Sequence, residues 1–166
     1  MAETCLLAID VGLSTGWAVV DHTHRVTSWA GHRFRSRQRY RRWARGLVLG
    51  IPDLAGVLLE GDRQLAQPFV SAASRRGCRV EIIGADRWRL DLFDPHEVKD
   101  TRTAKRSAIA YASTLLRAHR ARVPRTLRHD AAEAICLGVW AAQHWMGWPP
   151  PEETTPQWSP IPTLHG

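Results

Sequence analysis

Four carboxylates stand at positions where acidic side chains could do chemistry together. Asp10 ends an apolar run that begins at Cys5, and Glu60 ends a second apolar run, AGVLLE. Asp130 and Glu133 are three residues apart, so both project from one face if their segment is a helix. Functional groups gather at the carboxyl ends of the strands of open α/β sheets. We therefore expect these four carboxylates to converge.

A cluster of this kind is typical of a divalent-metal site. Burying an unpaired carboxylate is costly, and four together repel one another and raise their pKa values unless cations compensate. Ligand sets made of oxygen suit Mg²⁺ or Mn²⁺ rather than zinc. Taken alone, Asp10 could be a turn-forming residue before Gly12, and strand ends often carry a solvated acid. The apolar strands that precede Asp10 and Glu60 favour the metal site.

The elements that must position these acids follow from the hydrophobic pattern. Apolar runs bounded by Gly, Ser and Pro predict strands, and longer runs with a period near 3.6 predict helices. Strands are expected at 5–11, 16–21, 25–34, about 54–60 and 78–84, helices at 36–50, 64–77, 103–121 and 127–146, and a loop at 85–100. Thr103 is a candidate helix cap. The pattern predicts an α/β fold with a mixed five-stranded sheet, three antiparallel strands and then parallel ones, flanked by helices.

The charge of the chain favours a polyanionic partner. The net charge is +7, from 23 basic and 16 acidic residues, and only Lys99 and Lys105 among the basic residues are lysines. Nucleic acid is the common partner of so basic a protein. The arginines expected to bind DNA phosphates surround the start of the predicted helix 36–50 and are Arg35, Arg37, Arg39, Arg41 and Arg42. The alternative is a solvated basic surface, with arginine usage set by the base composition of the gene.

Length and composition limit the remaining possibilities. A chain of 166 residues is expected to form one domain, residues 1–148, followed by a Pro-rich, unpatterned and disordered tail at 149–166. No apolar stretch has the length of a membrane span and the N-terminus lacks the features of a signal peptide. We therefore expect an intracellular protein (cytoplasmic, organellar or virus-encoded) that is not secreted. Cys5, Cys78 and Cys136 are expected to be buried free thiols.

Three segments together resemble the RuvC-type Holliday junction resolvases of the RNase H-like nuclease superfamily, which also contains the retroviral integrases. These segments are LLAIDVGLSTGWAVVD, VLLEGD and HDAAEAICLGVWA. That family has an Asp followed by Xaa-Gly on its first strand and a Glu at the end of its fourth strand. On the last helix it has an acid or His three residues before another acid. The resemblance covers about residues 5–146 and implies an RNase H-like fold.

The resemblance also implies roles for individual residues. The ligands of two Mg²⁺ or Mn²⁺ ions would be Asp10, Glu60, Asp130 and Glu133. Lys105, at the start of the long helix before the last one, would be a catalytic contact to the phosphate near the metals. His129 would support the metal ligands as a neighbour or serve as an alternative ligand. Arg89, in the segment DRWR, and Lys99 would contact DNA.

The activity implied is that of a structure-selective DNA endonuclease that resolves four-way junctions by paired symmetric nicks. It would act as a homodimer, with no nucleotide cofactor and no membrane partner. Gly12 and Gly16 would allow a tight turn and leave room for a phosphate backbone. The chain departs from the family pattern at two points. Glu133 stands in place of the usual Asp, and the segment GDRQLAQPF after Glu60 lacks an aromatic wedge.

Three other functions stay open at this point. A nuclease with the same fold could act on other branched DNA or on RNA. The segment DVGLSTGWAVVD also resembles the first phosphate loop of actin-like kinases and ATPases, although those proteins need a second domain with another such loop. A non-catalytic DNA-binding module on a degenerate nuclease fold is the third, and the four intact acids argue against it.

Overall fold

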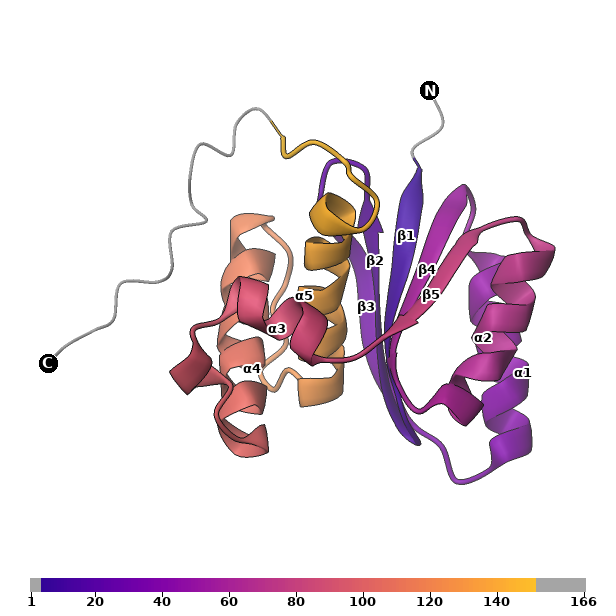
Figure 1. Cartoon of the computed structure of the whole chain (residues 1–166), viewed down its shortest axis with the longest axis horizontal. Coiled ribbons are helices and arrows are strands. Elements are labelled where there is room, and N and C mark those ends of the chain that lie inside the picture. The colour runs from indigo at the N-terminus through magenta and orange to yellow at the C-terminus, as the bar shows by residue number, and fades with distance from the viewer. Residues whose placement is uncertain (1–3, 152–166) are drawn as a thin grey trace, which may run out of the picture.

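A five-stranded sheet with helices on both faces organises the chain (Figure 1), for which a computed structural model describes residues 4–151. The strands are β1 (Cys5–Val11), β2 (Ser14–Asp21), β3 (Val26–Arg33), β4 (Leu54–Gly61) and β5 (Arg79–Ile83). The helices are α1 (Arg37–Gly50), α2 (Arg63–Arg75), α3 (Asp86–Leu92), α4 (Thr101–Ala118) and α5 (His129–His144), with a 3₁₀ turn at Pro95–Glu97.

The strand order is β3-β2-β1-β4-β5, and it confirms the mixed sheet expected from the sequence. β1 pairs antiparallel with β2, and β2 pairs antiparallel with β3. β4 and β5 run parallel to β1 because the helices α1 and α2 provide the crossovers that parallel strands require. Figure 1 shows α1 and α2 on one face of the sheet and α3, α4 and α5 on the other.

Alternation along the strands divides the interior into two cores. On β1, Leu6 and Ala8 belong to the core beneath α5, whereas Leu7 and Ile9 belong to the core beneath α1 and α2. Successive side chains of a strand point to opposite faces, so both faces of this central strand are buried. A strand enclosed on both faces forms a rigid base for the acid at its end.

The last helix, α5, is buried on all sides. Every residue from 130 to 142 is buried, because α5 lies between the sheet and α4. A helix that is apolar all round is expected in such a position. Its small residues permit close packing, and a side chain at Gly138 would meet Val20 and Ala8. The acids at the start of α5 are therefore held against the sheet.

The structure corrects several sequence-based boundaries. The segment 85–100, expected to be a loop, contains α3 and a 3₁₀ turn, because a seven-residue helix is too short to show clear periodicity. The helix expected at 103–121 spans Thr101–Ala118 and is capped by Asp100, whose carboxylate accepts a hydrogen bond from the N–H of Thr103. The last helix spans His129–His144 rather than 127–146.

The sequence also predicted buried free cysteines and a Pro-rich tail. Cys5, Cys78 and Cys136 are buried and free, as predicted. No helix within residues 4–151 is long and apolar enough to cross a membrane. Residues 152–166 of the predicted tail 149–166 lie outside the described residues.

Candidate functional site

Asp10 and Glu60 lie side by side at the carboxyl ends of β1 and β4. The two strands are parallel neighbours, and Asp10 pairs in register with Glu60. Leu6 and Leu58 precede these acids at even spacing and belong to the core beneath α5. Alternation therefore directs both carboxylates toward the α5 face of the sheet.

Glu133 joins this pair from α5. Its side chain is only 7% exposed, and its negative charge acts on both Asp10 and Glu60. The guanidinium of Arg89, on α3, donates a hydrogen bond to the Glu133 carboxylate and forms an ion pair with it. Three of the four predicted acids thus share one environment, and an arginine lies among them.

The environment of Asp10 and Glu60 opposes their ionisation. Burial is the largest cause that raises the pKa of Asp10, and the charges of Glu133 and Glu60 raise it further, to about 8. Burial also raises the pKa of Glu60, an effect that the charge of Arg89 partly offsets. Asp10 consequently holds its proton to a higher pH than an ordinary aspartic acid does, although Arg89 already lowers its pKa.

Asp130 is held differently from the other three acids. Its carboxylate accepts hydrogen bonds from the Ser14 hydroxyl at 2.8 Å and from Arg128 Nη2 at 2.9 Å. Arg128 Nε donates to the other oxygen at 3.2 Å. Burial alone would raise the pKa of Asp130, but the hydrogen bonds from Arg128 and Ser14 outweigh burial and hold that pKa below its usual value. Asp130 is therefore an ionised carboxylate with its donors already in place.

Gly16 allows the helix to approach the sheet rather than leaving room for a ligand. A Cβ atom built on Gly16 would lie 1.8 Å from the backbone oxygen of Asp130. The prediction that Gly16 leaves room for a phosphate backbone is therefore wrong, because the first turn of α5 fills that space. Gly12 lies in the short turn between β1 and β2, as expected, and its carbonyl accepts a hydrogen bond from the Thr15 hydroxyl.

The ligand types of the cluster fit a magnesium or manganese ion. All four side chains offer carboxylate oxygen, and a divalent cation would relieve the repulsion that raises the pKa of Asp10. In the conformation described for residues 4–151, no three acidic, His or Cys side chains are close enough to hold one ion. Arg89 engages Glu133 in that conformation.

The other predicted site residues lie around the same end of the molecule. Figure 1 shows α4 and α5 beginning where β1 and β4 end. Lys105 is half-buried near the start of α4 and Lys99 is exposed just before it, and neither forms an ion pair with any residue in 4–151. His129 is the half-buried first residue of α5 and makes no hydrogen bond to the Asp130 side chain.

The five arginines predicted to bind DNA phosphates around the start of the helix 36–50 are on the surface, before or along α1. The exposed set is Arg35, Arg37, Arg39, Arg41 and Arg42. None of them forms an ion pair with an acid in the described part of the chain. The first turn of α1 carries no acidic residue either, so this basic face has no internal counter-charge.

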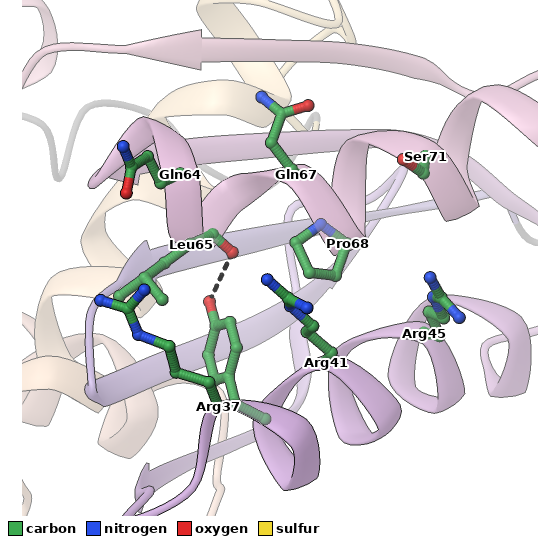
Figure 2. Close-up of a pocket in the computed structure, with 9 residues that line it drawn as sticks. Arg37, Arg41, Arg45, Gln64, Leu65, Gln67, Pro68 and Ser71 are labelled. Carbon is green, nitrogen blue, oxygen red and sulfur yellow. Dashed lines mark hydrogen bonds between the residues drawn. The ribbon is translucent and has the colours of Figure 1, made fainter.

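A shallow pocket of about 380 Å³ lies on the surface between α1 and α2. Figure 2 shows Arg37, Arg41 and Arg45 along the α1 side of this pocket. The Tyr40 hydroxyl donates a 2.9 Å hydrogen bond to the Leu65 carbonyl and joins the two helices. The α2 side is lined by Gln64, Leu65, Gln67, Pro68 and Ser71. The pocket combines three cationic groups with neutral polar ones, which suits an anion.

Sequence reasoning missed two residues of the site and did not foresee the ion pair that a third one forms. Ser14 and Arg128, the donors to Asp130, were not singled out, although Ser14 follows Asp10 closely and Arg128 precedes Asp130 by two residues. Arg89 was predicted to contact DNA, and in this structure it pairs with Glu133. Its position depends on α3, a helix that the sequence pattern did not reveal.

The strand order, the α5 packing and the carboxylates at the strand ends define an RNase H-like fold of the RuvC type. One solved structure with this similarity is that of T. thermophilus RuvC in complex with a Holliday junction substrate. The TM-score is 0.60 and the sequence identity 16%, over 87% of this chain and 96% of that chain. This likeness confirms the fold predicted from the sequence.

A second similarity to a solved structure is too weak to describe the fold of this chain. A structure of the simian T-cell lymphotropic virus intasome matches with a TM-score of 0.34 and 13% identity, over 100% of this chain and 68% of that chain, which is too low to support an argument. No protein-family model matches the sequence, and a search of curated proteins finds no match.

Proposed function

We propose that this chain is a divalent-metal-dependent DNA endonuclease that resolves four-way junctions by paired symmetric nicks. The observation that carries the proposal is the register pair of Asp10 and Glu60, which face Glu133 on a RuvC-type fold. The solved neighbour binds a Holliday junction, which supports a junction as the substrate. A twofold substrate suits a homodimer, which would place two such sites symmetrically.

The proposed mechanism assigns a task to each group. Asp10, Glu60, Asp130 and Glu133 would hold Mg²⁺ or Mn²⁺. The bound metal would supply Lewis-acid polarisation of the phosphate and a lowered pKa of attacking water. The buried strand β1 keeps Asp10 in place. Lys105 would add positive charge where the phosphate gains negative charge, and this stabilises the transition state.

The basic face of α1 would bind the DNA backbone. Cations in the first turn of a helix are unfavourable, because the N-terminus of the helix already carries partial positive charge. Arg37 and Arg39 lie in that turn of α1 with no acid beside them. A phosphate bound there would satisfy both the arginines and the helix end. Binding should therefore weaken steeply as salt concentration rises.

The direct test is cleavage of a four-way junction with mapped cut sites. The wild type is expected to make paired symmetric nicks with Mg²⁺ or Mn²⁺ and none after chelation. Asp10→Asn is expected to lose at least about a hundredfold in rate, because a metal ligand is lost. Asp53→Asn is the matched control, since Asp53 is exposed in a turn with φ 49°, a conformation that Asn tolerates. Equal cleavage by Asp10→Asn and the wild type would reject the assigned site.

A second substrate class is favoured by the surface that follows Glu60. Asp62, Arg63 and Gln64 are exposed there. The aromatic side chain of this segment, Phe69, is buried in the core beneath α1 and α2 and is not available to insert into a junction. A nuclease with this surface would act on other branched DNA or on RNA. A panel of junction, flap, duplex and RNA substrates of equal length separates the two. Faster cleavage of a flap or of RNA would favour this second substrate class.

A further inference from the structure

The short helix α3 brings an arginine to the carboxylate cluster. Trp88 of α3 is fully buried in the core beneath the sheet, and it anchors the helix. A second link is the hydrogen bond of 2.7 Å from Trp140 Nε1 on α5 to the carboxylate of Asp91 on α3. These two attachments hold α3 against the core and α5, and neither of them involves the Arg89 side chain.

Arg89 extends from this anchored helix to the acids. Its guanidinium pairs with Glu133, and its positive charge also acts on Asp10 and Glu60. The Arg89 side chain is 26% exposed, whereas that of Glu133 is 7% exposed. Arg89 therefore approaches a buried carboxylate from the solvent side, and part of its own side chain stays in contact with water.

We propose that Arg89 is the resident counter-ion of the carboxylate cluster and competes with the divalent metal for Glu133. This inference rests on the proposed function, because it concerns the same metal site. Binding of the ion requires the Arg89 guanidinium to leave Glu133 and turn toward solvent, while α3 stays in place through Trp88 and Asp91.

One observation and one physical argument support the competition. Within residues 4–151 no three acidic, His or Cys side chains close on one point, while Glu133 is engaged by Arg89. A guanidinium and a divalent cation repel each other strongly in a partly buried site. Removing the arginine would leave Glu133 without its ion-pair partner, so it should increase the demand of the cluster for metal.

The test is the affinity for Mn²⁺ of the full chain, measured by titration calorimetry without DNA. Arg89→Gln keeps a hydrogen-bond donor and removes the charge. The Kd of Arg89→Gln for Mn²⁺ is expected to be at least tenfold lower than that of the wild type. Arg87→Gln is the matched control, because Arg87 lies on the same helix and pairs with Glu81 away from the cluster. Its Kd is expected to equal the wild-type value. Arg89→Lys, which keeps the charge, is expected to stay within about threefold of the wild type.

A second measurement does not depend on the folding of Arg89→Gln. The guanidinium ¹⁵N signal of Arg89 is assigned as the one that is absent from the spectrum of Arg89→Lys. In the wild type, this Arg89 signal should shift as Mg²⁺ is added, and the Arg87 signal should not. Equal Mn²⁺ affinity in Arg89→Gln and the wild type, or a fixed Arg89 signal on a protein that binds Mg²⁺, would overturn the inference alone. Absence of metal binding by every variant, including the wild type, would overturn the proposed metal centre and the inference with it.

Discussion

Gly16 on β2 and Asp130 on α5 are in backbone contact. A side chain at Gly16 has no space, because its Cβ would lie 1.8 Å from the carbonyl oxygen of Asp130 and 2.5 Å from the backbone nitrogen of Ala131. Gly16 is also the register partner of Asp10 on β1. The first turn of α5 is thus seated on the strand next to Asp10, and this contact sets how near the helix acids come to the sheet acids.

The Gly16→Ala variant is expected to lose stability and to shift α5. The atoms in the way belong to backbone, which cannot move without displacing the helix, so a loss of at least about 3 kcal/mol in the free energy of unfolding is expected. Urea denaturation measures it. Gly46→Ala is the control, because Gly46 lies on α1 with no atom near its Cβ position, and alanine there should be neutral or stabilising. Equal stability of Gly16→Ala and the wild type would contradict the contact.

The raised pKa of Asp10 predicts a pH-dependent stability in the absence of metal. The folded protein keeps this proton up to about pH 8, whereas the unfolded chain loses it near pH 4. The free energy of unfolding is therefore undiminished by Asp10 below about pH 4. It falls as the pH rises from about 4 to about 8, by up to about 1.4 kcal/mol per pH unit. Asp10→Asn removes the titration, so the variant should become progressively more stable than the wild type toward pH 8.

Urea denaturation with chelator present, from about pH 5 to about pH 8, checks this difference. Titrating groups far from the cluster are common to both proteins and cancel in the comparison, so the difference reports the titration of Asp10 together with the neighbouring acids Glu60 and Glu133. Added Mg²⁺ should stabilise the wild type most at the high end of the range, where Asp10 is free to ionise. Parallel stability curves of the two proteins would show that Asp10 ionises normally.

The hydrogen bonds that hold the Asp130 carboxylate predict a loss of stability when Ser14 is truncated. Ser14→Ala removes one hydrogen bond to a buried, ionised carboxylate, which is expected to cost about 1.5–3 kcal/mol. Thr114→Ala is the control, because the Thr114 hydroxyl bonds only the exposed turn of its own helix and should change stability little. If Ser14→Ala cost no more than this control, the hydrogen bond would contribute nothing to stability.

A double-mutant cycle isolates the same interaction. Once Asp130 is replaced by Asn, the further change Ser14→Ala should cost much less than it does in the wild type, because the charged acceptor is gone. Additive losses would show that Ser14 acts on something other than Asp130.

The basic face of α1 predicts a measurable salt dependence of DNA binding. Replacing Arg37 and Arg41 by Ala should weaken junction binding and reduce the slope of log affinity against log salt by about 1 for each phosphate that the variant no longer binds. The control replaces Arg75 and Arg117, which are exposed near the ends of α2 and α4. An unchanged slope in the α1 variant, measured by fluorescence anisotropy, would remove that face from the DNA interface.

Part of the site could be predicted from the sequence because local patterns report burial. The apolar runs before Asp10 and Glu60 indicated two buried strands, and alternation in those strands explains why both acids face α5. The three-residue spacing of Asp130 and Glu133 indicated a common helix, which is correct. It did not show that α5 is buried on all sides, so that one acid meets Ser14 while the other meets Arg89.

The sequence by itself determined the order of the strands and of the helices other than α3, and the positions of the acids along them, because periodicity records which side of each element is buried. Only the tertiary structure decided that Asp130 meets Ser14 and that Glu133 meets Arg89. Ser14 bonds Asp130 across 116 residues of chain, and Arg89 pairs with Glu133 across 44. Such pairings depend on how closely α5 approaches the sheet and on where α3 docks. These are properties of packing that no local pattern contains.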